Sequence, residues 1–313
     1  MIRSGSTIKA IGTESKRIQF IGAYEGAGSW QGIHIESNTD NQLAYCDFLN
    51  MGSWARNDIG GLQLLGPAKV GISHCKFTNG LGTGLHARRS NNCQITAFDH
   101  NIFEGYENFP PVVLESYQSL SSIEKFDMTS DFTNNAKKYI QITPDLKKDV
   151  TINQTTVPYY FDWEMPNFNY HLTINEGVTI YMAHDLHASS GILTGRLTIN
   201  GTADKKVKFT RLPSSSNYWG NITFYGLCGS EINHCIFEYG GFINGGYSSI
   251  LYITRGAELT LNNVEINNSA TYGIRIAYCD YQLTHNNVTF SNNGIANVRD
   301  ECADPPVDRD DLP

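Results

Sequence analysis

Residues suited to acid–base chemistry recur at matching places in the first half of the chain. His34 and Glu36 alternate with the apolar residues of one predicted strand, and His86 and Arg88 alternate with those of another. An imidazole or a carboxylate can act as a general base, while a guanidinium can neutralise charge that develops on a substrate oxygen. If this chain is an enzyme, Glu36, His86 and Arg88 are its expected catalytic residues.

One reaction that such a set could perform is acid–base cleavage of a polysaccharide. A lyase removes the proton next to a uronate carboxylate, whereas a glycosidase needs two carboxylates about 5 to 9.5 Å apart. Glu36 could pair with Asp40 or Asp58, but both aspartates fall in predicted loops, and no Asp-x-Asp or Asp-Asp doublet marks the set. The alternative, which the sequence favours, is a row of solvated polar side chains on an exposed strand face.

A different set of side chains could hold a sugar without cleaving it. An aromatic ring stacks on the apolar face of a sugar, and neighbouring polar groups bond its hydroxyls. Aromatic residues at bends can instead cover the corners of a fold, and both interpretations stay open. The candidate ligand-binding residues are His34, Gln63, Trp54, Tyr225, Tyr252 and Arg275.

An internal repeat predicts the elements that position these residues. A shift of 189 residues aligns segment 8–52 with 197–241 without a gap, and it matches Trp30 with Trp219. Within the first half, short segments with apolar residues at alternate positions recur after 29 and then 23 residues. Such segments predict strands, and a coil of two or three short strands must stack on copies of itself to bury its apolar side.

The repeat therefore predicts an all-β fold, a single-stranded right-handed parallel β-helix (solenoid) of about 11–12 coils. Segments 172–180, 195–202 and 219–224 resemble the coil signature of bacterial right-handed β-helix repeat proteins. The resemblance covers nearly the whole chain and implies the architecture that pectate lyases, rhamnogalacturonases, tailspikes and adhesins share. Most members of the group are predicted to be secreted or surface proteins, and the resemblance implies no particular activity.

The expected domain is one continuous β-helix over residues 1–298, built from two related halves of about 1–188 and 189–298. Residues 299–313 are acidic and Pro-rich without an alternating pattern, so we expect a tail or linker there. The coils ahead of the repeated Gly-Thr pair in the second half have no counterpart in the first half, which indicates a piece of a longer chain or an unusual cap. The chain holds no signal peptide, and we expect that one was removed or lies outside it.

The seven cysteines divide into two groups once the repeat is known. Cys46, Cys75 and Cys235 share one inward position of the coil and are predicted to be buried thiols, with a bridge between the first two left open. The other four lie at predicted turns or in the tail and are the better disulfide candidates, although their pairing cannot be deduced. They are Cys93, Cys228, Cys279 and Cys302.

Composition excludes several classes of protein. With 40% hydrophobic and 17% charged residues, the chain of 313 residues is expected to be globular and not disordered. Its net charge of −8 gives no attraction for nucleic acid, and no apolar run is long enough for a transmembrane helix. No motif indicates a metal or a cofactor. Ca²⁺ between Asp and Asn side chains is conceivable, but no EF-hand or RTX-type string supports it.

We therefore expect an extracellular or cell-surface β-helix module, acting as a monomer, that binds a polysaccharide or another surface ligand without transforming it. The alternative is a polysaccharide lyase or glycoside hydrolase acting on an acidic or neutral glycan. A structural stalk or adhesin is the third hypothesis.

Overall fold

The computed structural model describes residues 1–52, 60–88, 93–115, 120–143, 148–162, 170–183, 191–193, 195–226, 229–242 and 248–313. In this part the chain is all-β, and its parallel strands stack as a β-solenoid, or β-helix, of about 9 turns. We call each turn of the solenoid a coil. The described residues contain one short 3-10 helix, η1 (Leu120–Lys125), and no helix with the length and apolar character needed to cross a membrane.

The predicted fold class is confirmed, but the solenoid has fewer coils than the 11–12 expected. The expectation rested on coils of about 22 to 29 residues. Some coils instead carry long connections, as where Leu197 N donates to Ser230 Oγ in the neighbouring coil, 33 residues along the chain. Such coils use more of the chain than the sequence pattern indicated.

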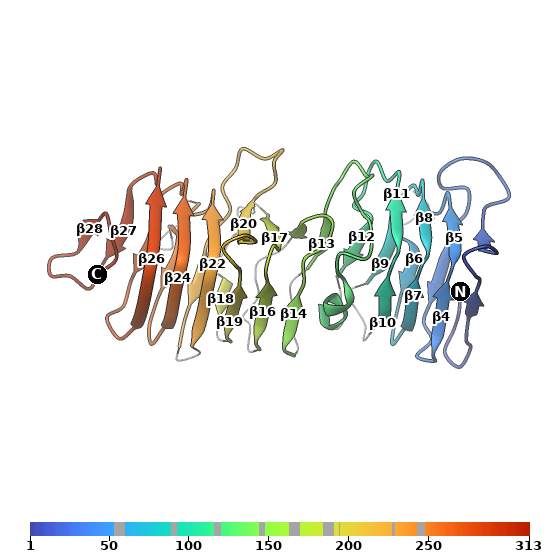
Figure 1. The fold of residues 1–313 in the computed structure, drawn as a ribbon, viewed down its shortest axis with the longest axis horizontal. Coiled ribbons are helices and arrows are strands. Elements are labelled where there is room, and N and C mark those ends of the chain that lie inside the picture. Colours follow the sequence, from blue (N-terminus) through green and yellow to red (C-terminus); the bar gives the residue numbers. More distant parts are fainter. Residues whose placement is uncertain are drawn as a thin grey trace. The chain divides into compact units, whose positions relative to one another are not determined.

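Contacts within the chain divide it into two compact units, unit 1 (Met1–Thr143 with Asn153–Tyr159) and unit 2 (Pro144–Ile152 with Tyr160–Pro313). Unit 1 consists of three stacks of parallel strands (Figure 1). The first stack contains β3 (Ile33–Ile35), β6 (Gly60–Leu64), β9 (Thr83–Ala87), β12 (Val112–Leu114) and β13 (Ile140–Ile142). The second contains β1 (Lys9–Ile11), β4 (Asn41–Ala44), β7 (Lys69–Ser73) and β10 (Gln94–Asp99). The third contains β2 (Ile18–Phe20), β5 (Cys46–Leu49), β8 (Lys76–Thr78) and β11 (Ile102–Glu104).

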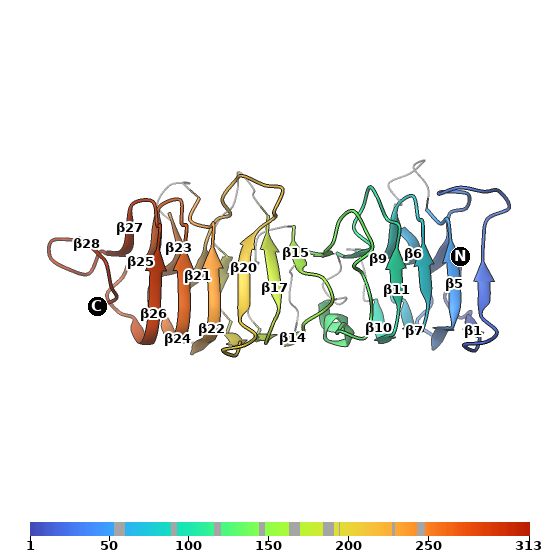
Figure 2. The same ribbon diagram turned by 45° about the horizontal axis from the view of Figure 1, so that its top comes forward.

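Unit 2 follows this plan, but in its later coils one long strand takes the place of the strands of the second and third stacks (Figure 2). One stack contains β18 (Gly191–Leu193), β21 (Ile222–Phe224), β23 (Ser249–Ile253), β25 (Tyr272–Ile276) and β27 (Ala296–Asp300). The other is centred on β22 (Ser230–Glu238), β24 (Glu258–Asn267) and β26 (Gln282–Ser291). Its shorter strands are β14 (Val150–Ile152), β16 (Leu172–Asn175), β17 (Thr179–Met182), β19 (Leu197–Asn200) and β20 (Val207–Arg211), while β15 (Tyr159–Phe161) spans the division between the units along the chain.

Residues with a left-handed backbone form the corners of the coils. In unit 1, Tyr45, His74 and His100 have φ of 52°, 51° and 51° and separate the second stack from the third in successive coils. Asn and Gly adopt this conformation most readily, whereas other residues lose about 1–2 kcal/mol in it. The next corner is formed by Asn50, Asn79 and Gly105, and the corresponding corners of unit 2 are His234, Asn263 and Asn287, then Tyr239, Asn268 and Asn292.

Side chains of one type lie over each other inside unit 1. The rings of Phe20, Phe48, Phe77 and Phe103 form a column with centroid separations of 4.9, 4.8 and 4.4 Å. Parallel pairing places each residue about 4.8 Å from its counterpart in the next coil, a separation at which the centroids of offset-stacked rings are found. The alternating sequence pattern is therefore sufficient to build this part of the core.

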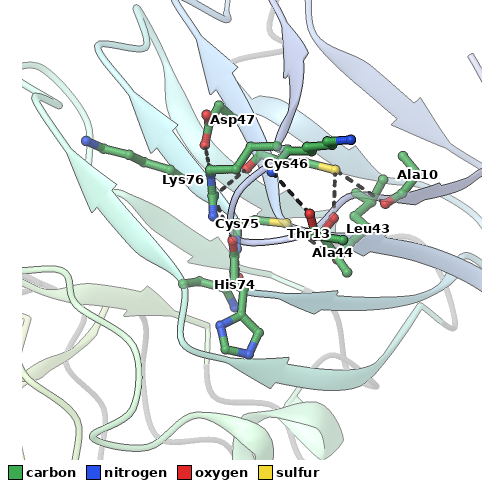
Figure 3. Close-up of polar contacts among 12 residues, drawn as sticks. Ala10, Thr13, Leu43, Ala44, Cys46, Asp47, His74, Cys75 and Lys76 are labelled. Carbon is green, nitrogen blue, oxygen red and sulfur yellow. Dashed lines mark hydrogen bonds and ion pairs between the residues drawn. The ribbon is translucent and has the colours of Figure 1, made fainter.

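The predicted core thiols are confirmed, because Cys46, Cys75 and Cys235 are buried and none of them forms a disulfide. Cys75 Sγ donates to the carbonyls of Leu43 and Ser73, and Figure 3 shows the thiols of Cys46 and Cys75 close to Leu43. The neighbouring Cys46 thiol and burial raise the pKa of Cys75, and burial raises the pKa of Cys235. These two sulfurs are therefore protonated packing groups.

Two of the four predicted disulfide candidates are paired, since Cys279 and Cys302 form a disulfide. Cys93 is buried and lies directly before β10, outside the strand. Cys228 lies outside the described residues.

The segment 299–313, expected as a tail without strands, contains β28 (Val307–Arg309), which pairs antiparallel with β27. Arg299 Nη1 lies 3.0 Å from Asp308 Oδ1 across this pair. The segment is rich in Pro and Asp and has no alternating apolar pattern, so the sequence does not predict a strand there. Its partner strand, the ion pair and the disulfide at Cys302 hold it in place.

Asparagines inside the coils satisfy the backbone where strands stop. Asn101 is fully buried, its Oδ1 accepts from Cys75 N at 2.9 Å, and its Nδ2 donates to Ile72 O at 3.1 Å. Removing the amide would leave one buried N–H and one buried carbonyl without this partner, and each such loss costs about 1–3 kcal/mol.

We predict that Asn101→Ala lowers the free energy of unfolding by about 2–4 kcal/mol. Asn262 is the matched control, because its Nδ2 donates to Asn233 Oδ1 in a hydrogen bond that is partly exposed to solvent. Asn262→Ala should therefore cost less than about 1 kcal/mol. Urea titration followed by circular dichroism measures both. Equal losses in the two variants would contradict this role for Asn101.

Candidate functional site

The predicted outward residues of the first stack form one continuous row in unit 1. The parallel register places His34 opposite Gln63, Gln63 opposite His86, and His86 opposite Val113. Neighbouring members of the row are thus about 4.8 Å apart along the stack. The structure brings together the imidazoles and the amide that the repeat pattern had placed on one face.

Gln63 and His86 in this row are covered, and not exposed as the alternating pattern had indicated, whereas His34 is half-buried. Gln63 is 0% exposed and His86 is 3% exposed. A Cβ added to Gly60 would lie 2.5 Å from His86 Cβ and 3.1 Å from Gln63 Cγ, so the backbone at Gly60 packs directly against both side chains. Alternation identifies the side of a strand on which a residue lies, but not what packs over it.

Several buried polar atoms on this face have no hydrogen-bond partner. In the described part of the chain, none is present for Gln63 Oε1, Thr83 Oγ1 or either ring nitrogen of His86. Gln63 Nε2 donates to Gly60 O at 3.2 Å, which leaves its oxygen as the unmatched half of the amide. Each unmatched buried group costs about 1–3 kcal/mol, and such groups are uncommon unless water or a ligand completes them.

Glu115 joins this cluster, and the sequence analysis did not select it. Its Oε2 lies 3.2 Å from His86 Nε2, an ion-pair distance, although the two groups are not oriented as in a hydrogen bond. Glu115 directly follows β12, as Arg88 directly follows β9, and the two strands are paired in register. Extending the apolar repeat by one coil to Val112 and Leu114 would have found it.

The three residues expected to be catalytic do not come together as a set. Glu36 follows β3 and Arg88 follows β9, and Leu65, which follows β6, occupies the coil between them. His86 is instead closest to Glu115. Of the two aspartates considered as partners for Glu36, Asp40 lies 3.8 Å from Lys69 Nζ, and Asp58 is outside the described residues.

The ligand-binding candidates of unit 2 are mostly engaged with each other. Arg275 lies opposite Tyr252 in register, its Cζ is 5.8 Å from the Tyr252 ring centroid, and its Nη2 lies 2.6 Å from Glu301 Oε1. Tyr225 has an exposed ring, and Trp54 lies outside the described residues. Thr223 Oγ1 also lacks a partner among the described residues. In register, Tyr252 lies opposite Thr223 in the next strand, and Arg275 lies opposite Tyr252.

A second polar cluster lies at a corner of unit 1. The rings of Tyr45, His74 and His100 are stacked, with centroid separations of 4.4 and 4.6 Å. They line, with Arg17 and Lys76 among others, a pocket of about 260 Å³. Figure 3 shows the His74 ring directed away from the thiols of Cys46 and Cys75. The ring of His74 is covered on both faces by the rings of Tyr45 and His100, so it presents its edge to solvent and is poorly suited to stacking on a sugar.

The unmatched hydroxyl of Thr83 generates a stability test. Thr83→Val should raise the free energy of unfolding by about 1 kcal/mol, because the buried hydroxyl loses its hydrogen bonds to water and gains none in the protein. Thr271 is an equally buried threonine whose Oγ1 donates to Gly241 O at 2.9 Å, so Thr271→Val should lower the same quantity by about 1–2 kcal/mol. Urea denaturation compares the two, and a clear loss of stability in Thr83→Val would show that its hydroxyl is matched.

No protein-family model matches this chain, and no curated protein or solved structure matches it. Of the resemblance stated from the sequence, the parallel β-solenoid itself is what the structure bears out.

Proposed function

We propose that the chain is a binding module that holds a polysaccharide, or another hydroxyl-rich surface ligand, on the outer face of β6 and β9 and releases it unchanged. Because Gln63 and His86 are buried, the ligand displaces what covers them when it binds. The observation that carries this proposal is the set of buried atoms without a hydrogen-bond partner, Gln63 Oε1, Thr83 Oγ1 and His86 Nδ1. A sugar hydroxyl both donates and accepts, so hydroxyl groups complement an amide oxygen, a threonine hydroxyl and an imidazole equally well.

The arrangement in successive coils also favours an extended ligand. Gln63 and His86 lie opposite each other in adjacent strands, and Thr83 lies opposite Gly60 at the start of the same strand pair. Polar groups repeated at the strand spacing of about 4.8 Å offer a chain-like ligand a series of contacts along the stack. A compact ligand would use fewer of them.

The Cys279–Cys302 disulfide supports an extracellular or cell-surface location. Disulfides persist in oxidising compartments and are rare in reducing ones. We propose that the module acts there as a monomer.

A second candidate function is that of a polysaccharide lyase, which the His86–Glu115 pair favours. A carboxylate 3.2 Å from a buried imidazole is placed to orient it as a general base, and Arg88 is near enough along the stack to neutralise a substrate carboxylate. Hydrolysis would need a second carboxylate at glycosidic spacing, and the described residues of this row show no such pair. Binding remains the better supported function, because the expected catalytic trio is not assembled.

The test is a glycan array with the whole chain, followed by titration of the glycans that bind. Gln63→Met keeps the shape of the side chain but removes its amide oxygen, so we expect affinity to fall about tenfold or more. Tyr225→Ala is the control, because it removes an exposed ring from unit 2 and should leave affinity unchanged.

The bound glycans are then incubated with the protein and assayed for unsaturated products and new reducing ends. Binding without products supports the module. Products that disappear in His86→Gln and Glu115→Gln would establish the lyase instead. Absence of binding to any glycan, or loss of affinity in Tyr225→Ala alone, would overturn the proposed site.

A further inference from the structure

Two imidazoles and a carboxylate meet at one corner of unit 1, away from the row that contains Gln63 and His86. The ligand atoms of His74, Asp99 and His100 all lie within 4.8 Å of one another. Among the described residues, these three form the cluster of His, Cys, Asp or Glu side chains that could hold a metal ion. We propose that this corner binds a divalent transition-metal ion of the zinc type.

The register of the second stack builds the cluster from residues that are distant in sequence. Ser73 at the end of β7 pairs with Asp99 at the end of β10, so the residues that follow, His74 and His100, occupy the same corner in adjacent coils. Both have a left-handed backbone with φ of 51°, which makes their side chains leave the corner in the same direction. Their rings stack at 4.6 Å with an interplanar angle of 9°.

The donor atoms and their distances suit a zinc-type ion. Asp99 Oδ1 lies 3.1 Å from His100 Nδ1 and 3.9 Å from His74 Nε2. Neutral imidazole and carboxylate are ligands of zinc-type ions at about 2.0–2.2 Å, which places tetrahedral ligand atoms about 3.3–3.5 Å apart. A metal lies in the plane of each imidazole, so the stacked rings must tilt toward each other, and their partial exposure leaves room for this. Water would complete the coordination.

The charges around the cluster permit a cation. Arg17 Nε lies 2.6 Å from Asp47 Oδ1, and Lys76 Nζ lies 2.7 Å from Glu104 Oε1, so both cations that line the pocket are compensated. The carboxylate of Asp99 is then an anionic group of the site that is available to a cation. The nearby thiol of Cys75 is buried and does not compete, because a metal requires a thiolate.

Unit 2 shows that this corner does not need histidine in order to fold. At the equivalent positions Asn263 Nδ2 contacts His234 Nε2 at 3.4 Å, and Asn287 Nδ2 donates to Asn263 Oδ1 at 2.8 Å. Asparagine therefore occupies the corner with the same left-handed backbone in this chain. Substitution of His74 or His100 by Asn removes a metal ligand while keeping a residue that the corner accepts.

The test is calorimetric titration of Zn²⁺ into the whole chain without an affinity tag, with the visible absorption of bound Co²⁺ as a second readout. We expect one ion per chain and a tetrahedral Co²⁺ spectrum. His74→Asn and His100→Asn should each weaken binding by at least about tenfold and abolish the Co²⁺ bands. Circular dichroism checks that each variant is folded.

His234→Asn is the matched control, because it removes an imidazole from the equivalent corner of unit 2 and should leave the affinity and the spectrum unchanged. The proposal is overturned if the wild-type chain binds no Zn²⁺, or if folded His74→Asn and His100→Asn bind it as the wild type does. These readouts use no glycan, so they are independent of the proposed function.

Discussion

Parallel hydrogen bonding between successive coils is the interaction on which the rest of the structure depends. It places each residue beside its counterpart one coil away, as where His34, Gln63 and His86 form a single row. The stacked phenylalanines, the asparagine ladder of unit 2 and the imidazoles of unit 1 are all consequences of this register. A residue type at one position of the repeat thereby becomes a column, and a polar residue becomes part of a linear surface.

The two halves of the sequence share this scaffold but use its outward positions differently. At the corner, unit 1 has Tyr45 and His74 where unit 2 has His234 and Asn263. On the outer face of unit 2, Arg275 contacts Tyr252 and Glu301. Both units bury polar atoms without a hydrogen-bond partner among the described residues, as at Thr223 Oγ1 in unit 2 and Gln63 Oε1 in unit 1. Unmatched buried groups reduce stability and are selected against in a merely structural face. Unit 1 differs in that an imidazole and a carboxylate, those of His86 and Glu115, lie beside its unmatched atoms.

Local alternation in the sequence was enough to predict the β-helix, the inward thiols Cys46 and Cys75, and the row that contains His86. It did not predict the burial of Gln63, which depends on what packs over the strand. It also did not predict β28, which depends on a partner strand. Glu115 was missed because the repeat was not followed one coil further. The cluster of His74, Asp99 and His100 could not be recognised by the usual close spacing of metal ligands, because the two imidazoles come from different coils and meet only through the register.

The central claim is that the buried polar atoms on the outer face of β6 and β9 are completed by a ligand. A crystal structure of the chain with a glycan from the array tests this most directly. We expect sugar hydroxyls at hydrogen-bond distance, about 2.7–3.2 Å, from Gln63 Oε1 and Thr83 Oγ1. A glycan bound elsewhere, or ordered water on these atoms with no glycan displacing it, would contradict the claim.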